Sequence, residues 1–223
     1  MFSYTEILRQ MCHMSHNFYR FTQTGRSEDF FTFYENDLDG YDNFNIIIDS
    51  KEVSVHVSNG KTKACVHVEG ADTVAKIGFS DFRVNHVLRE LEIYSEAERV
   101  GVSEILVYTH YLLKLNNVDV IESDFVECDC DGQSVVSDVY DKCSDSMSDD
   151  DITEMIDYGD GLFETLFSFY YSVSTIDRAL WFIMDYEVND LHCANMGYDR
   201  NGKIKLIDYS GYFPEKSYVK LEY

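Results

Sequence analysis

The spacing of apolar side chains changes several times along the chain, and each change predicts a different element. A helix is predicted over residues 4–20 by apolar residues at helical spacing, namely Tyr4, Ile7, Leu8, Met11, Met14 and Phe18. Residues 52–58, 63–69 and 73–79 then alternate apolar and polar positions and are rich in β-branched side chains. This alternation predicts three strands, and Asn59-Gly60 between the first two is typical of a hairpin turn.

The pattern next returns to helical spacing over residues 81–101. One face of this helix is predicted to be apolar, with Gly101 as its end and with Val84, Val87, Leu88, Leu91 and Tyr94 along it. Residues 105–115 and 118–126 alternate again, and they predict a second hairpin that turns at Asn116-Asn117.

Residues 127–160 are dominated by acidic side chains, with Lys142 as the only base, and serine and glycine are frequent. Such a composition predicts a solvated acidic insert that is at least partly disordered. The run over 161–184 is apolar and aromatic, which predicts a buried helix or helix pair. Behind it, "KIKLIDY" is predicted to be a strand that follows the turn "DRNG".

The order of these elements predicts an α+β protein with two lobes. We expect an N-terminal helical extension over 1–50, a five-stranded lobe with one helix over 51–126, an acidic insert over 127–160 and a reduced helical lobe over 161–223. A chain of 223 residues can bury a core of this size.

Composition narrows the possible partners. The formal net charge of −23 argues against nucleic acids and anionic membranes, which carry the same sign, and it favours partners with basic surfaces. The six cysteines are irregularly spaced, as in proteins of a reducing cytoplasm, and Cys128, Cys130 and Cys143 are predicted to be free thiols. No secretory leader or membrane span is predicted, and the oligomeric state is left open.

Three polar residues near the C-terminus have a spacing that suggests chemistry. In "DLHCANMGYDRNGKIKLIDYSG", Asp190 precedes Asn195 by five positions, and Asp208 follows Asn195 after thirteen more. The turn between them is expected to bring Asn195 and Asp208 to one Mg²⁺ site, because this cation prefers carboxylate and amide oxygens. Asp190 would orient an attacking hydroxyl and accept its proton. The alternative is that all three are turn residues, and His192 is expected to brace their loop.

Phosphoryl transfer from ATP also needs groups that hold the phosphates, and the upstream sequence offers candidates in the expected order. Lys76, in "TVAKIGF", would bind the α- and β-phosphates, and Glu90 would hold that lysine, with Glu92 as the second choice. Asn59 and Gly60 would form the tip of a phosphate-covering hairpin. Glu122-Ser123-Asp124 would form the hinge beside adenine. The ordered set predicts a minimal protein-kinase-like fold.

The chain resembles the small early serine/threonine protein kinases of podoviruses, which infect bacteria. The resemblance covers roughly residues 50–213 and lies in "NGKTKAC", "VAKIGF", "DLHCANM" and "LIDYSG". It implies Mg²⁺-dependent phosphate transfer from ATP to serine or threonine of host proteins in the bacterial cytoplasm during takeover of the host. "DLHxxN" is also similar to the loop of aminoglycoside and choline kinases, which act on small molecules.

Several positions depart from the kinase pattern. The covering hairpin keeps one glycine where active kinases usually keep three, and Val188 stands where many protein kinases have a histidine. Only 15 residues follow Asp208, so we expect substrate recognition to come from the N-terminal helix or the acidic insert. Two alternatives follow: a pseudokinase or acidic decoy that inhibits a host enzyme or defence protein, and a small-molecule phosphotransferase.

Overall fold

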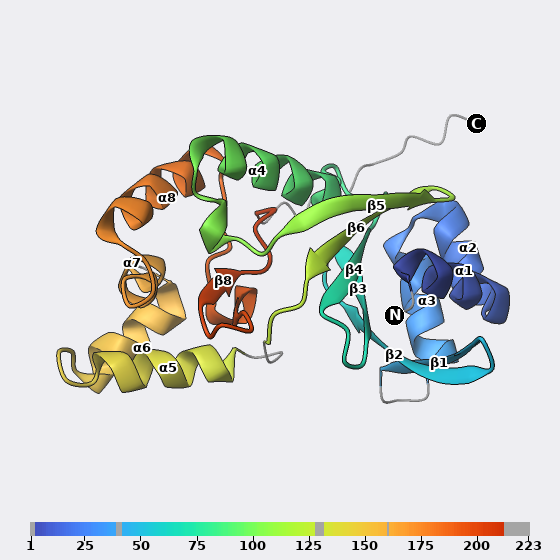
Figure 1. The fold of residues 1–223 in the computed structure, drawn as a ribbon, viewed down its shortest axis with the longest axis horizontal. Helices are drawn as coiled ribbons and strands as arrows, with labels where there is room; N and C mark the ends of the chain where they lie inside the picture. Colours follow the sequence, from blue (N-terminus) through green and yellow to red (C-terminus); the bar gives the residue numbers. More distant parts are fainter. Residues whose placement is uncertain (1–2, 39–41, 128–131, 160, 212–223) are drawn as a thin grey trace. The chain divides into compact units, whose positions relative to one another are not determined.

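The computed structural model describes residues 3–38, 42–127, 132–159 and 161–211 (Figure 1). Its contacts divide the chain into two compact units. Of the described residues, unit 1 contains 3–38, 42–91 and 109–124, and unit 2 contains the rest. The element order is three N-terminal helices, a six-stranded antiparallel sheet with one helix within its sequence, and a helical region that ends in a short hairpin. The prediction of an α+β protein is therefore confirmed.

The N-terminal segment is not the single helix predicted over 4–20. It forms α1 (Tyr4–Met14) and α2 (His16–Thr24), and a third helix, α3 (Ser27–Asp37), was not predicted. The predicted helix is interrupted at Ser15, whose backbone is extended and ends α1. The Ser15 hydroxyl accepts a hydrogen bond from the Phe18 amide at 2.9 Å. A serine in this position is a strong helix N-cap, so it starts a new helix rather than continuing the old one.

The antiparallel sheet lies in unit 1 and has the strand order β1-β2-β3-β4-β6-β5. Its strands are β1 (Asn43–Ile48), β2 (Lys51–Asn59), β3 (Lys63–Val68), β4 (Thr73–Gly78), β5 (Thr109–Leu115) and β6 (Val118–Asp124). The three predicted strands and both predicted hairpins are present, but the expected number of five strands is wrong because β1 adds a sixth. The turn from β1 to β2 uses Asp49 and Ser50 at positive φ, which few residues other than glycine adopt.

One face of this sheet is apolar and packs against the N-terminal helices. Along β4, Ala75 and Ile77 point to this face, and neighbouring strands add valines and alanines at alternate positions. The helices contribute aromatic rings that contact one another at centroid distances of 5.0–5.9 Å, namely Phe18, Phe21, Phe30 and Phe33. Burial of this aromatic cluster stabilises the packing of α2 and α3 on the sheet, and α1 adds Ile7, Leu8 and Met11 to the same core.

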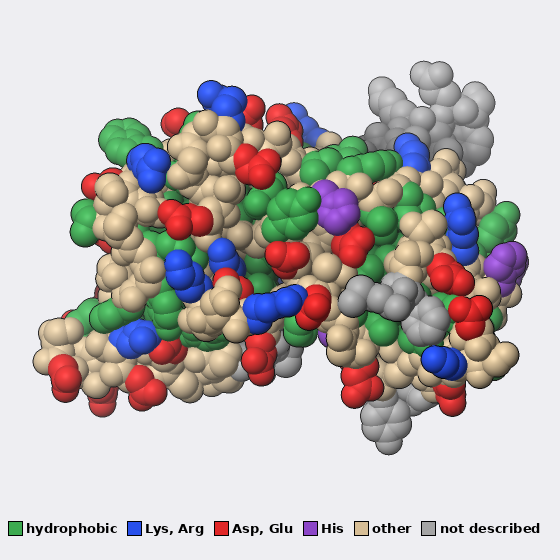
Figure 2. Space-filling model, in the orientation of Figure 1, with side chains coloured by type: hydrophobic (Ala, Val, Ile, Leu, Met, Phe, Trp, Pro, Cys, Tyr) green, Lys and Arg blue, Asp and Glu red, His purple; other side chains and the backbone are tan. Residues whose placement is uncertain are grey.

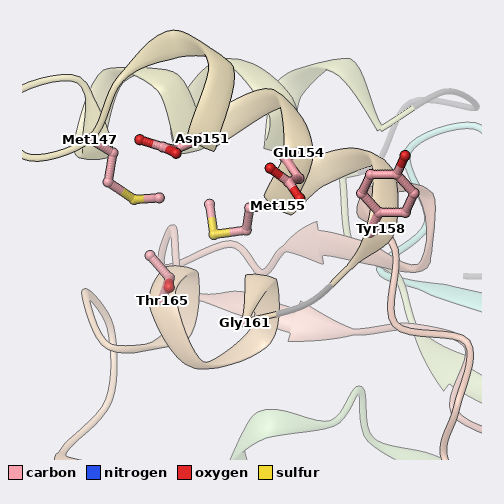
Figure 3. Close-up of a pocket in the computed structure, with 7 residues that line it drawn as sticks. All are labelled: Met147, Asp151, Glu154, Met155, Tyr158, Gly161 and Thr165. Atoms are coloured by element: carbon pink, nitrogen blue, oxygen red, sulfur yellow. The ribbon is translucent and has the colours of Figure 1, made fainter.

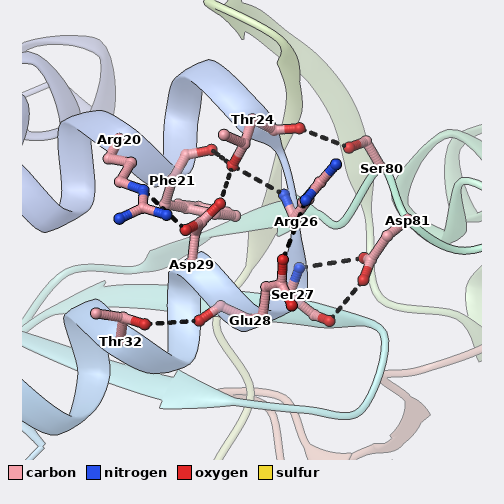
Figure 4. Close-up of polar contacts among 10 residues, drawn as sticks. All are labelled: Arg20, Phe21, Thr24, Arg26, Ser27, Glu28, Asp29, Thr32, Ser80 and Asp81. Atoms are coloured by element: carbon pink, nitrogen blue, oxygen red, sulfur yellow. Dashed lines mark hydrogen bonds and ion pairs between the residues drawn. The ribbon is translucent and has the colours of Figure 1, made fainter. Parts of the chain in front are cut away.

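Polar contacts fix the joint between α2 and α3 to the loop that follows β4 (Figure 4). The backbone amide and the hydroxyl of Ser27 both donate to the Asp81 carboxylate, at 3.1 and 2.7 Å. The Ser80 hydroxyl donates to the Thr24 carbonyl at 3.1 Å. Gly25 lies between these contacts at φ +70, where a Cβ would stand 2.3 Å from the Ser80 hydroxyl oxygen. The loop after β4 is therefore tied to the N-terminal helices as well as to its own strand.

Helix α4 (His86–Val100) confirms the helix predicted over 81–101, and Gly101 ends it at φ +76. Its buried face differs from the predicted one. Leu88 is 37% exposed, whereas Glu90 is fully buried. The division between the units falls within this helix, after Leu91.

In its described residues, unit 2 contains four further α-helices, two short 3₁₀ helices and a two-stranded hairpin. These elements are η1 (Ser103–Ile105), α5 (Gln133–Cys143), α6 (Asp149–Tyr158), α7 (Leu162–Phe167), α8 (Val173–Asp185), η2 (Cys193–Asn195), β7 (Met196–Tyr198) and β8 (Ile204–Leu206). The predicted helix pair after residue 161 and the predicted strand after "DRNG" are confirmed. None of the helices in the described ranges is long and apolar enough to cross a bilayer.

The expectation of a partly disordered acidic insert is wrong for residues 133–143 and 149–158, which are helical. Val135, Val139 and Cys143 of α5 recur at helical spacing and are buried in the core of unit 2, as are Ile152 and Met155 of α6. This stripe is narrow, and the acidic residues around it dominate the composition, so the segment has the average polarity of a disordered one. Cys128 and Cys130 lie outside the described residues, and the four described cysteines are free thiols.

The aromatic cluster predicts a large asymmetry between two neighbouring positions of α2. Phe21→Ala should lower the free energy of unfolding by about 3–5 kcal/mol, because it removes a fully buried ring and leaves a cavity. Tyr19→Ala, on the exposed side of the same helix, should change it by less than about 0.5 kcal/mol. Guanidinium denaturation followed by circular dichroism measures both. Equal losses would contradict the packing of α2 on the sheet.

Candidate functional site

The second face of the sheet in unit 1 is polar and carries the predicted lysine. Lys76 pairs across the sheet with Cys65 of β3 and Ile121 of β6, so its side chain leaves the face opposite to Ala75 and Ile77. Lys63 pairs with Gly78, two positions along β4, and therefore points to the same face as Lys76. Strand alternation thus places two lysines side by side on one surface.

Helix α4 approaches this face at Gly78, the last residue of β4. A Cβ at Gly78 would stand 2.7 Å from a methyl carbon of Val87 and 2.8 Å from the Asn85 side-chain oxygen. Glycine at this position therefore allows β4 and α4 to approach closely, whereas the side chain of any other residue would force them apart. Asn85 fixes the start of the helix, since its side chain accepts from the Leu88 amide at 3.3 Å and donates to Asp119 of β6 at 2.9 Å.

Glu90 lies one turn into α4 and is held by both lysines. Lys76 Nζ donates to Glu90 Oε2 at 2.7 Å, and Lys63 Nζ donates to Glu90 Oε1. The carboxylate is fully buried, and the two lysine side chains are only 6–7% exposed. The predicted pairing of Lys76 with Glu90 is therefore observed, and Glu92, the second choice, is exposed. Lys63 was not among the predicted residues.

The other residues predicted for nucleotide binding lie elsewhere in unit 1. Asn59 and Gly60 are exposed at the hairpin between β2 and β3, where the Gly60 amide donates to the Lys63 carbonyl at 2.9 Å. Glu122 pairs with Ala75, so its side chain points to the face opposite to Lys76, where it accepts from the Thr73 hydroxyl at 2.6 Å. Asp124 ends β6 and is exposed.

The predicted catalytic loop in unit 2 folds back on itself through its own side chains. Asn195 Nδ2 donates to the Asp190 carbonyl at 2.9 Å and lies 3.1 Å from His192 Nε2. The same histidine nitrogen is 3.4 Å from the Asp190 carboxylate. Residues 190, 192 and 195 therefore form one contiguous polar group, and the expected bracing role of His192 agrees with these contacts.

The hairpin β7–β8 carries Asp208 to this loop. Met196 pairs with Leu206, and the Ile207 amide donates to the Asn195 carbonyl at 3.0 Å, so the ladder continues to the residue before Asp208. The turn is closed by Asp199, whose carboxylate accepts from the amides of Asn201 and Lys203 at 2.8 and 3.0 Å. These hydrogen bonds lower the pKa of Asp199 against the opposing effect of its partial burial. Asp208 Oδ1 accepts from the Ser210 hydroxyl at 3.1 Å.

Helix α5 supports both the loop and the hairpin. A Cβ at Gly132, which precedes α5, would lie 2.5 Å from the Cys193 backbone, so only glycine permits this approach. Asp138 of α5 accepts from the hydroxyls of Tyr198 and Tyr170 at 2.8 and 2.7 Å. Burial, followed by the contact with Asp138, raises the pKa of both tyrosines. The sequence does not reveal this cluster, because the composition around α5 predicts an insert that is at least partly disordered.

Asn195 and Asp208 are the residues that the sequence predicts at a Mg²⁺ site, and their side-chain oxygens are of the type that this cation prefers. The Asn195 Nδ2 donates to the Asp190 carbonyl, which leaves the amide oxygen as the atom for a ligand. Within the described ranges, no group of three or more His, Cys, Asp or Glu side chains is placed to hold a metal. Binding of Mg²⁺ at the predicted residues would therefore use the Asn195 amide oxygen and water in addition to the Asp208 carboxylate.

Comparison with known proteins identifies no family for this chain. No protein-family model matches the chain, and no curated protein matches it. The structure brings Lys76 and Glu90 together in unit 1, and it brings Asp190 and Asn195 together in unit 2, with Asp208 two residues after the end of β8. The function proposed below is therefore based on the chemistry of these residues.

The buried carboxylate predicts a strong dependence of stability on Glu90. Glu90→Gln should lower the free energy of unfolding by about 3–5 kcal/mol, because it removes the charge to which two buried ammonium groups bond. Glu92→Gln, two residues along the same helix and exposed, should change it by less than about 0.5 kcal/mol. Chemical denaturation of the two variants measures the difference. Similar small losses would contradict a buried ion pair at Glu90.

A second prediction concerns the tyrosine that holds β8. The Tyr171 hydroxyl donates to the carbonyls of Ile204 and Glu104 at 2.7 and 3.0 Å, and burial is the main cause that raises its pKa. At neutral pH, Tyr171→Phe should lower the free energy of unfolding by about 1–3 kcal/mol. Above pH about 10, the unfolded chain loses the proton that the folded one keeps, so this tyrosine's contribution falls as pH rises.

The gap in stability between wild type and Tyr171→Phe should therefore narrow between neutral pH and pH about 11. Urea denaturation at several pH values measures that gap. Tyr158→Phe serves as the control, because the Tyr158 side chain is 76% exposed and should behave as wild type at every pH. A constant gap would show that the Tyr171 hydroxyl ionises as readily in the folded protein as in the unfolded one, and a widening gap that it ionises more readily; either result contradicts the prediction.

Proposed function

We propose that this protein is an ATP- and Mg²⁺-dependent phosphotransferase of protein-kinase-like architecture that acts on serine or threonine hydroxyls of proteins. The observation that carries the proposal is the buried pair of Lys76 and Glu90 at 2.7 Å, which joins the strand and the helix expected from the order of the motifs. A lysine of this kind is energetically costly to bury, and phosphate binding gives a chemical reason to keep it.

In this proposal, unit 1 binds the nucleotide phosphates. Lys76 would neutralise charge on the α- and β-phosphates, and Glu90 would hold its ammonium group at a fixed position, so little reorganisation is needed when the phosphates bind. Lys63 shares the same carboxylate and would add a second positive charge on that face of the sheet. The hairpin tip at Asn59 and Gly60 would cover the phosphates.

Unit 2 would supply the groups that act on the acceptor and on the metal. Asp190 would orient the acceptor hydroxyl and take its proton as the oxygen attacks the γ-phosphorus, while the bond from that phosphorus to the β–γ bridging oxygen breaks and ADP leaves. Asn195 and Asp208 would hold Mg²⁺, which supplies charge neutralisation for the phosphates when bound. The hairpin and the contacts of the Asn195 amide keep these side chains in a defined geometry before any ligand binds.

The acceptors that suit this chain are proteins with basic surfaces. The net charge of −23 attracts such proteins over distances of the order of the Debye length, about 8 Å at physiological ionic strength. Together with the resemblance to the podoviral kinases, this supports host bacterial proteins as substrates and the bacterial cytoplasm as the place of action.

Labelled ATP, Mg²⁺ and a bacterial protein extract test the proposed activity. Wild type should transfer label to protein serine or threonine, and Lys76→Met, Asp190→Asn and Asp208→Asn should each reduce transfer by about a hundredfold or more. Lys51→Met and Asp185→Asn remove the same kinds of charge at exposed positions and should retain activity. Melting curves of all variants separate loss of activity from loss of folding.

Three outcomes would contradict this proposal. Transfer that is equal in wild type and Asp190→Asn would exclude the proposed base. Label found only on a small alcohol or sugar would assign a small-molecule phosphotransferase. Absence of any rise in melting temperature with ATP and Mg²⁺ would exclude nucleotide binding by the folded protein.

A second candidate function is an acidic decoy that retains the fold without turnover. The observation that favours it is the concentration of charge in residues 127–160, where twelve acidic residues and one lysine give a net charge of −11. Such a protein would bind a basic surface of a host enzyme stoichiometrically. Binding that survives Lys76→Met and weakens with salt, in the absence of any phosphate transfer, would select this function.

A further inference from the structure

A groove in unit 2 lies between α6 and α7, away from the residues assigned above. It has a volume of about 590 Å³ and is lined by Met147, Asp151, Glu154, Met155, Tyr158, Gly161 and Thr165. Figure 3 shows Met147 and Met155 directed into the space between the two helices, with Thr165 facing them from α7. Asp151 and Glu154 project from α6 at its edge. This space is large enough for one or two side chains of another molecule.

The floor of the groove is apolar and adaptable. Met155 is only 6% exposed and belongs to the core of unit 2, and Met147 packs against that core. Thioether side chains are flexible and polarisable, so they accommodate apolar groups of differing shape. A Cβ placed at Gly161 would meet no atom within 4 Å, so the groove is open on the side of α7. An apolar side chain of a ligand could therefore pack against the two methionine side chains.

The edge of the groove is strongly acidic. Helix α6 begins with Asp149, Asp150 and Asp151, and Glu154 and Asp157 follow on its exposed surface. Across the described part of the chain, neither Asp151 nor Glu154 forms an ion pair. Figure 2 shows acidic side chains gathered over α5 and α6, at the lower left of the view. The single lysine of this segment, Lys142, lies 3.5 Å from Asp138.

Charge selects the occupant of this groove. A second copy of the chain would also carry −23, and nucleic acids and anionic lipids are likewise negative, so each of them would be repelled. A simple cation would satisfy the carboxylates and leave the methionine floor without a partner. A ligand that combines a positive charge with an apolar side chain satisfies both parts of the groove.

We propose that the α6–α7 groove docks a basic amphipathic segment of a partner protein. One apolar side chain of the segment lies on Met147 and Met155, and flanking lysine or arginine side chains pair with Asp151 and Glu154. This docking does not depend on phosphate transfer, because it uses none of the residues assigned to the nucleotide or the metal. It defines the partner for the kinase and for the decoy alike.

Binding of a fluorescent peptide to the full-length protein tests the docking site without ATP. The peptide is about three helical turns long, with a central leucine and phenylalanine flanked on both sides by lysine and arginine. Wild type should bind it with an affinity that falls as salt rises. A peptide with serine in place of the two apolar residues should bind about tenfold more weakly, and one with glutamate in place of the basic residues should not bind.

Matched variants separate the groove from general acidity. Asp151→Asn with Glu154→Gln should weaken binding by about tenfold, and Asp150→Asn with Asp157→Asn, which removes the same charge from α6 outside the groove, by about threefold or less. Asparagine at 151 keeps an oxygen for the Ser148 hydroxyl, which caps the helix. Thr165→Trp leaves the charge unchanged and fills the groove, so it should also weaken binding by about tenfold.

Several results would overturn this proposal. They are the absence of peptide binding, equal weakening by the two charge-removing pairs, and binding that is unaffected by Thr165→Trp. Sedimentation that shows a dimer which Thr165→Trp dissociates would assign the groove to a second copy instead. Loss of phosphate transfer with retained peptide binding would contradict the proposed function and leave the docking site standing, so the two proposals fail separately.

Discussion

The position of α4 depends on one buried carboxylate. Glu90 is fully buried, and a charge in that environment is stable only when cationic groups bond to it. Its two lysine partners come from adjacent strands, so the pairing register of β3 and β4 and the entry of the helix at Gly78 must all be correct for the contacts to form. A slip of one residue in either strand would turn its lysine to the apolar face. The same constraint fixes the ammonium group of Lys76, which is the condition for any role in phosphate binding.

The sequence predicted the parts of the fold whose patterns are local and regular. Strand β2 alternates apolar and polar residues, β3 and β4 are short and carry β-branched residues, and Asn59-Gly60 marks the hairpin between β2 and β3. Helix α4 has a clear end at Gly101, and the loop from Asp190 to Asn195 precedes an obvious turn. Strand β1 was missed because acidic and asparagine residues surround it and because its turn uses Asp49 and Ser50 at positive φ rather than a glycine. Helices α5 and α6 were missed because their buried stripes are narrow within a strongly acidic composition.

Residues of the candidate site in unit 1 could be predicted from the strand and helix patterns, whereas the tyrosine cluster of unit 2 could not. The choice of Glu90 over Glu92 depends on which side of α4 faces the sheet, and the apolar pattern misplaced that side at Leu88. Lys63 could have been found from the hairpin, since the register that places Cys65 opposite Lys76 also places Lys63 on the same face. The cluster of Tyr170, Tyr198 and Asp138 joins three segments that are far apart in the sequence, and no local sequence pattern predicts such contacts.

The two proposals for unit 2 involve neighbouring elements of its fold. Gly132, just before α5, contacts the candidate catalytic loop, and α5 itself contacts the hairpin through Asp138 and packs against α6, which lines the groove described above. Acidic side chains are tolerated here because they lie on the exposed faces of helices whose buried faces join the core. Negative charge repels phosphate, so it suits a surface that receives a basic partner better than one that receives a nucleotide. In the proposed function, the buried lysines of unit 1 serve the phosphates and the acidic helices of unit 2 serve a basic partner, so groups of opposite charge lie in different segments of the chain.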